Sequence, residues 1–249
     1  MYDKYIQEFT NDDPINFKGL IIYPVTVRDY FKFMTYSNIL CIDKNSISDK
    51  NIISMSYLDF LIYLMTKSGK DSNNYAYVFY ELMKLCLRRD DIDIYYGLNK
   101  DKKRFIKIDN VEIYKKDFNE LKDIILHQNI PDYKEVDINP DLKKDLEEKE
   151  RLEKKGRRPV SIEKQITSIV ISSSLTYKDV LDLTIRKFYI ILEMIDKKLH
   201  YEIYKTASLS GMVEFKTEIE HYLSETDTDG IDSKIIDVGT LSSKFNIGR

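Results

Sequence analysis

Residues 176–207 read TYKDVLDLTIRKFYIILEMIDKKLHYEIYKTA, and this stretch decides the fold. Apolar residues recur in it alternately four and three positions apart, which is the spacing of a heptad seam on one helix face. The seam residues are Leu181, Ile185, Phe188, Leu192, Ile195 and Leu199. The seam is too short for an independent coiled coil, so we expect one helix from Thr176 to about Ala207, packed within a bundle.

A second apolar stripe follows the same predicted helix. It consists of Leu183, Ile190, Met194 and Tyr201. A helix with apolar residues on two sides is expected to contact other elements or chains on both of them. We therefore take these four residues as the candidate partner-binding residues.

The elements around this helix complete a C-terminal helical domain over residues 161–223. Thr176 is followed by Asp179 three residues later, the pattern of a capping box that begins a helix. A preceding helix is predicted from Ser161, and a short helix is predicted over 213–223. Residues 224–249 are polar and acidic with little apolar periodicity, which predicts a flexible tail.

Residues 129–160 are predicted to form a linker and a charged helical arm. Pro131 and Pro140 interrupt any regular period, and residues 141–155 are almost wholly charged. Several acidic residues there precede a basic residue by four positions, which stabilises an exposed helix by roughly 0.2–0.5 kcal/mol per pair.

The densest basic run of the chain lies at the end of this arm. Its cations are Lys154, Lys155, Arg157 and Arg158. Such a cluster can neutralise phosphates, so these four residues are candidates for phosphate contacts. Acidic residues lie directly upstream, and no aromatic residue interleaves the run for base stacking. Nucleic-acid binding is therefore the alternative function and not the leading one.

Residues 1–128 are predicted to form a helical domain with a small β-meander. Helices are expected over 49–67, 74–87 and 115–127, where apolar residues follow helical spacing. The period changes to two over residues 91–114, which predicts three short antiparallel strands.

The beginning of this domain is predicted as an extended segment over 15–25, followed by a helix. Thr26 and Asp29 form a second Thr-x-x-Asp pattern, which indicates a capping box at the start of that helix. Together, the segments predict an α+β fold that is predominantly α-helical, with a bundle-like C-terminal domain.

The overall charge argues against binding of nucleic acid by the whole surface, and the sequence pattern argues against secretion and membrane insertion. The 249 residues include 39 basic and 42 acidic ones, giving a net charge of −3, so no global field attracts phosphates. The N-terminus lacks the pattern of a signal peptide, and no apolar run approaches the roughly 20 residues that cross a bilayer. We expect a soluble intracellular protein without a membrane partner.

No motif for catalysis, cofactor binding or metal binding is present. The three histidines stand apart from any nucleophile or paired carboxylate of a known signature, and no Gly-rich phosphate loop occurs. Residues 225–230 resemble the start of a calcium loop, but Ile236 stands where the loop needs a bidentate glutamate. Cys41 and Cys86 are expected in the core. We expect no enzyme, although a carboxylate site assembled from distant residues stays open.

Short motifs resemble those of phage proteins. The stretch 210–216, SGMVEFK, follows Tyr201-x-x-Tyr204-x-x-Ala207 and precedes Ile219-x-His221-Tyr222-Leu223. Through these motifs, Gly156 to Leu223 resembles proteins of tailed bacteriophages and prophages of low-GC Gram-positive bacteria. In the first half, Tyr23-Pro24-Val25, the stretch 42–47 (IDKNSI) and the stretch 52–58 (IISMSYL) are similar to the same proteins.

The resemblance is to tail-module products, especially tail-assembly chaperones. A minor structural tail protein is the other interpretation. It implies other phage tail proteins as partners, including the tape-measure protein, and leaves a homo-oligomer open. It also implies a location in the host cytoplasm during assembly, with the virion tail as a further location. The motifs carry no catalytic residue.

Overall fold

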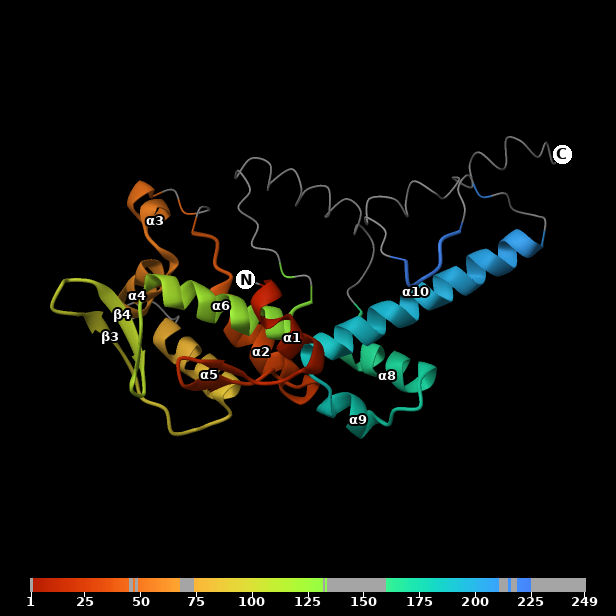
Figure 1. Cartoon of the computed structure of the whole chain (residues 1–249), viewed down its shortest axis with the longest axis horizontal. Helices are drawn as coiled ribbons and strands as arrows, with labels where there is room; N and C mark the ends of the chain where they lie inside the picture. Colours follow the sequence, from red (N-terminus) through yellow and green to blue (C-terminus); the bar gives the residue numbers. More distant parts are fainter. Residues whose placement is uncertain are drawn as a thin grey trace. The chain divides into compact units, whose positions relative to one another are not determined.

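The computed structural model of the protein describes residues 2–44, 47, 49–67, 74–131, 133, 160–210, 215 and 219–224. Contacts divide the chain into two compact units, Met1–Tyr189 and Ile190–Arg249, called unit 1 and unit 2 below. The fold is α+β and predominantly helical, as predicted, with two small antiparallel sheets among the described residues (Figure 1).

Unit 1 begins with η1 (Tyr2–Tyr5) and α1 (Ile6–Asn11), followed by the hairpin of β1 (Ile15–Phe17) and β2 (Leu20–Ile22). The hairpin turns at Lys18 and Gly19, whose φ angles are 53° and 94°. Glycine adopts such positive φ angles without a steric penalty, so Gly19 suits this turn. The extended segment predicted over 15–25 is therefore a two-stranded sheet.

The next elements are η2 (Val27–Asp29), α2 (Tyr30–Ser37) and η3 (Asn38–Leu40). The capping box predicted from Thr26 and Asp29 is wrong. The Thr26 side chain makes no capping hydrogen bond, and the Asp29 carboxylate instead forms an ion pair with Lys32 Nζ at 2.8 Å. The cause is tertiary, because Thr26 forms a β-bridge with Thr184.

Three helices follow: α3 (Lys50–Ser54), α4 (Tyr57–Lys67) and α5 (Tyr75–Leu87). The single helix predicted over 49–67 is wrong, because it is interrupted before α4. Ser56 Oγ accepts a hydrogen bond from Asp59 N and donates one to Asp59 Oδ2, which starts a new helix there. The helix predicted over 74–87 is confirmed as α5, with Asn74 as its cap.

The predicted β-meander is confirmed as β3 (Ile94–Leu98), β4 (Arg104–Ile108) and β5 (Val111–Ile113), which pair antiparallel in the order β3-β4-β5. It leads into α6 (Lys115–Asn129), which confirms the helix predicted from residue 115. One sheet face carries the fully buried side chains of Ile106, Ile108 and Ile113. The strand β4 contacts α4, and β5 contacts α6. The sheet and these helices thus share one core.

Aromatic side chains fill the centre of this core. The ring of Phe118 on α6 lies 6.2 Å from that of Phe79 on α5 and 6.3 Å from that of Tyr57 on α4, measured between centroids. Burying each such ring stabilises the fold by roughly 1.5–3 kcal/mol. Cys86 is buried, as predicted, whereas the prediction for Cys41 is wrong, because that residue follows η3 in an exposed bend.

The last described elements are α8 (Ile162–Ser172), α9 (Tyr177–Asp182) and α10 (Ile185–Leu209). The capping box of Thr176 and Asp179 is confirmed at the start of α9. The prediction of one continuous helix from Thr176 is wrong, because Leu183 and Thr184 separate α9 from α10.

Two further sequence predictions fall largely outside the described residues. Of the helix predicted over 213–223, residues 215 and 219–223 are described and form no helix. Most of the predicted linker and arm, 129–160, is not described. The division between the two units lies inside α10, at Tyr189 and Ile190, but the domain boundaries drawn from the sequence stay predictions.

Candidate protein-binding surface

The start of α10 is held in unit 1 by backbone pairing. Val27 N donates to Leu183 O, and Ile185 N donates to Val25 O, each at 2.9 Å. These two bonds flank the β-bridge between Thr26 and Thr184. Leu183 has an extended backbone, with φ −61° and ψ 151°, which ends α9. The interruption of the helix is therefore caused by pairing with a distant segment.

The Thr184 side chain starts α10 and connects it to α1. Its hydroxyl donates to Asp12 Oδ2 at 2.9 Å and accepts from Lys187 N at 3.2 Å, as an N-terminal cap does. Burial raises the pKa of the Asp12 carboxyl, while the Thr184 hydrogen bond and the charges of Lys187 and Arg186 act in the opposite direction. This buried polar contact fixes the first turn of α10.

The end of α6 makes polar contacts with the first turn of α10 and with the segment before η2. Arg186 is 7% exposed and donates to His127 O at 3.0 Å. Burial, and next the charge of Arg186, lower the pKa of the His127 imidazole. Asn129 is fully buried, and its amide accepts from Val25 N at 2.7 Å and donates to Ile125 O at 2.8 Å. These contacts are structural and offer no nucleophile or metal ligand set.

In unit 2, α10 continues from Ile190, and aromatic rings pack on its last turns. The Tyr201 ring lies 5.1 Å from that of His221 and 5.8 Å from that of Tyr222, while the Tyr204 ring lies 5.6 Å from that of Phe215. Phe215, His221 and Tyr222 therefore lie on the side of the helix that carries Tyr201 and Tyr204.

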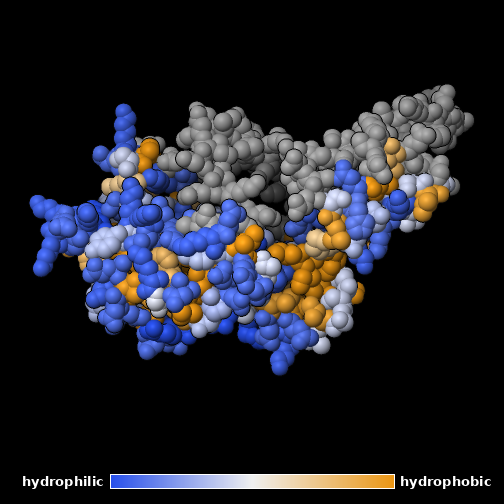
Figure 2. Space-filling view, in the orientation of Figure 1, coloured by the Kyte–Doolittle hydropathy of each residue, from blue (hydrophilic) through white to orange (hydrophobic). Residues whose placement is uncertain are grey.

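A different side of α10 exposes apolar side chains. Leu199 is 49% exposed and Ile203, one turn further, is 61% exposed. Residues four apart lie on one helix face, so these two extend the row that contains Leu192 and Ile195, which are half-buried. Figure 2 shows apolar side chains along α10 between charged ones. We call Leu192, Ile195, Leu199 and Ile203 the α10 apolar face.

The predicted partner-binding residues occupy different environments. Leu183 lies in the segment between α9 and α10 and thus leaves the predicted stripe. Ile190 and Met194 are half-buried on α10, and Tyr201 is in contact with His221 and Tyr222. A binding role for these four residues stays a prediction. Sequence reasoning missed Ile203, although its position four residues after Leu199 was a usable signal.

The predicted phosphate contacts Lys154, Lys155, Arg157 and Arg158 lie outside the described residues. The structure shows another cationic site, a groove of about 510 Å³ between α4 and the β-meander. Its cations are Lys102, Lys103, Arg104 and Lys115. Arg104 Nε lies 3.7 Å from Asp59 Oδ1, and the three lysines form no ion pair with any described residue.

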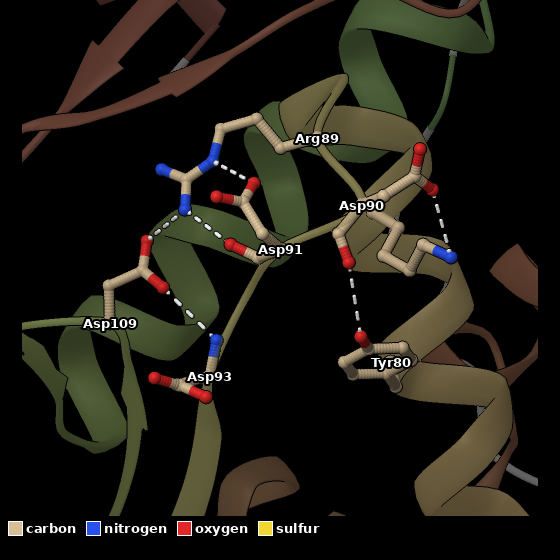
Figure 3. A network of polar contacts seen from close by, with 7 residues as sticks. Tyr80, Arg89, Asp90, Asp91, Asp93 and Asp109 are labelled. Atoms are coloured by element: carbon tan, nitrogen blue, oxygen red, sulfur yellow. Dashed lines mark hydrogen bonds and ion pairs between the residues drawn. The ribbon is translucent and has the colours of Figure 1, made fainter.

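Four aspartates, Asp90, Asp91, Asp93 and Asp109, lie near the start of β3, but their carboxylates point in different directions (Figure 3). Arg89 Nη2 lies 3.0 Å from Asp109 Oδ2 and donates to Asp91 O at 2.8 Å, while Asp109 Oδ1 accepts from Asp93 N. Asp90 pairs with Lys84 at 3.0 Å. The Asp109 carboxylate thus holds the segment between α5 and β3 through Arg89 and Asp93 N. No group of His, Cys, Asp or Glu among the described residues is suited to bind a metal ion.

Comparison with known proteins gives one connection, on the segment that contains α8, α9 and α10. Residues 153–227 match the family model described as YomV second domain. This match connects the segment with phage-derived, YomV-like proteins, as the sequence motifs indicated. The match covers less than half of the chain and does not name a tail-module role. No curated protein and no solved structure matches the chain.

The helices of the structure also bear on the expected absence of a membrane span. Among the helices formed by the described residues, none combines the length and the apolar character that a membrane-spanning helix needs. The longest of them, α10, has 25 residues, but charged residues such as Glu193, Asp196, Lys197 and Lys198 interrupt its apolar stretches.

Proposed function

We propose that this chain is a non-enzymatic phage protein that binds other proteins of the phage tail, as a tail-assembly chaperone or a minor tail protein. The observation that carries the proposal is the α10 apolar face, which lies within the segment matched by YomV second domain. Leu199 and Ile203 present a row of apolar side chains of the kind that an amphipathic partner helix covers.

The partner best suited to this face is a helical segment of another tail protein, the tape-measure protein being the first candidate. Seam residues at four- and three-residue spacing allow side chains of a second helix to pack between them. Covering the exposed parts of Leu199 and Ile203 would stabilise such a complex by roughly 1 kcal/mol for each residue. A partner helix must therefore contact further residues of the row.

Affinity purification after co-expression with the tape-measure protein tests the proposal. We expect the wild-type chain to co-purify with the partner and the double variant Leu199→Asp, Ile203→Asp to lose it, because two charges would be buried in an apolar contact. Lys205→Asp is the matched control, since it changes the net charge by the same two units at an exposed, polar position of α10.

The control should retain the partner. Circular dichroism should show equal helix content for all three proteins, since the substituted side chains are exposed. Absence of co-purification with the wild-type chain, while both proteins stay soluble, would refute the chaperone version. Equal retention by the double variant would exclude the α10 apolar face as the binding surface.

The alternative, a nucleic-acid-associated phage or regulatory protein, rests on the basic run 154–158. Under that hypothesis, the cations of the groove in unit 1 are a second group of residues that would contact phosphates. A gel-shift experiment across salt concentrations separates it from the leading proposal, because phosphate contacts weaken as ionic strength rises.

A further inference from the structure

The strand β3 is an unprotected edge of the three-stranded sheet. It pairs with β4 on one side, and the sheet order β3-β4-β5 leaves its other side without a partner strand from the part of the chain that the structure describes. The five residues Ile94–Leu98 read IYYGL and include no proline and no charge. Proteins usually protect exposed edge strands with proline or charged residues, because an open edge can pair with another strand.

Backbone geometry shows which groups of β3 point outward. At the two ends of the β3-β4 ladder, Asn99 N donates to Lys103 O and Asp109 N donates to Asp93 O. Hydrogen-bonded and non-bonded pairs alternate along an antiparallel ladder. Counting from these ends, Tyr95 and Gly97 bond to β4, whereas the N–H and C=O groups of Ile94, Tyr96 and Leu98 face the open side. Hydrogen bonds from these three residues to other described residues are absent.

The side chains of β3 are also exposed. Tyr95 is 61%, Tyr96 37% and Leu98 62% exposed. The strand therefore offers backbone donors, backbone acceptors and apolar surface together, which are what a second strand needs for pairing.

We propose that β3 pairs antiparallel with β3 of a second copy of this chain. With Tyr96 on the two-fold axis, Ile94 lies opposite Leu98 of the second copy, and all three outward-facing residues exchange hydrogen bonds. The pairing forms roughly six bonds between the chains. It joins the two meanders into one continuous six-stranded sheet. This inference concerns unit 1 and does not rest on the proposed function of α10.

The charges at the two ends of β3 favour a second copy over an unrelated strand. Residues 89–93, before β3, contain three aspartates and one arginine, and residues 100–104, after it, contain four cations and one aspartate. Antiparallel pairing of two identical strands places the acidic end of each copy beside the basic end of the other. The edge is thus self-complementary in charge, as a two-fold interface requires.

A charge-swap experiment on the full chain tests this arrangement by sedimentation velocity. Variant one is Lys102→Glu, Lys103→Glu, which makes both ends acidic; variant two is Asp90→Lys, Asp91→Lys, which makes both ends basic. These four residues are exposed, so the fold should persist. Each variant alone should dimerise at least about tenfold more weakly than the wild type.

The two variants mixed in equal amounts should associate again, because each acidic end then meets a basic one. Tyr96→Lys should also weaken the dimer, since it places two lysines opposite each other on the axis. A monomeric wild type would overturn the proposal. So would a wild-type dimer that neither swap weakens, or swap variants that fail to associate when mixed.

Hydrogen exchange gives an independent readout of the strand. As the concentration of wild-type chain rises, the amides of Ile94, Tyr96 and Leu98 should become slower to exchange, while those of Tyr95 and Gly97 stay unchanged because they already bond to β4. Exchange rates of the first three amides that do not depend on concentration would contradict pairing through β3, even if the chain dimerised elsewhere.

Discussion

Asn129 satisfies two buried backbone groups with one side chain. Its amide bonds both Val25 N and Ile125 O, so it joins the segment before η2 to the end of α6. Asn129→Ala leaves the Val25 N–H without its acceptor, and we expect the free energy of unfolding to fall by about 1–3 kcal/mol in urea denaturation.

Asn119 provides the matched control on the same helix, because it is exposed. Asn119→Ala should leave the stability unchanged or raise it slightly, since alanine has the higher helix propensity. If both alanine variants unfolded at the same urea concentration, the bridging role of Asn129 would be wrong.

His127 should make the stability of unit 1 dependent on pH. Burial and the charge of Arg186 hold its pKa below the ordinary value of 6.5. The folded protein therefore binds fewer protons than the unfolded chain just below that value. Stability is fully present above a pH of about 6.5 and falls as the pH decreases toward the pKa of the folded state.

His127→Phe removes the titration and keeps a ring beside those of Phe9 and Tyr133. We expect the free energy of unfolding of this variant to change less between about pH 7 and pH 5 than that of the wild type. Equal slopes for both proteins would assign the pH dependence to other groups.

Single residues also show where sequence patterns stop being sufficient. Thr176 and Asp179 have the same spacing as Thr26 and Asp29, yet the first pair forms a capping box and the second does not. The local pattern predicts a cap wherever the backbone is free to begin a helix. At Thr26 the backbone pairs with Thr184 instead, and no local pattern contains that contact.

The break between α9 and α10, like the one between α3 and α4, was not predicted from the sequence. Leu183 and Thr184 fit a continuous helical period, and the break depends on hydrogen bonds from the segment around Thr26. The β-meander and α5 were predictable, because alternation, apolar spacing and caps lie within each element. The α10 apolar face was predictable in part, since Leu192, Ile195 and Leu199 belong to the seam and Ile203 does not.

Hydrogen exchange tests whether the two paired segments behave as one unit. The amides of Val27 and Ile185 bond across the junction, so each is exposed only when the pairing opens. We expect Val27 and Ile185 to exchange with the same free energy of opening, within about 0.5 kcal/mol, in native-state measurements. An Ile185 amide that exchanged much faster than that of Val27 would show that α10 detaches alone.

The charge of the whole chain leads to a prediction about nucleic acid. Acidic residues outnumber basic ones, 42 to 39, so phosphate binding has to come from a local cluster. We expect no gel shift of DNA or RNA at about 0.15 M salt, where screening limits weak contacts.

A shift that weakens steeply with rising salt would instead favour the nucleic-acid alternative. Replacing Lys154, Lys155, Arg157 and Arg158 by alanine would then locate the contacts, and replacing Lys102 and Lys103 would be the comparison for the groove. A salt-dependent shift abolished by the first set alone would assign the binding to the basic run.

The pairing of Thr26 with Thr184 sets a condition on how the protein is made. Arg28 and Asp182, which form an ion pair beside this junction, are 154 residues apart in the chain. At about 5–20 residues per second, the ribosome adds the intervening residues in roughly 8–30 s. During that time Val25 O and Val27 N lack the partners that they have in the folded protein. The growing chain is therefore open to chaperones or premature contacts until the start of α10 emerges.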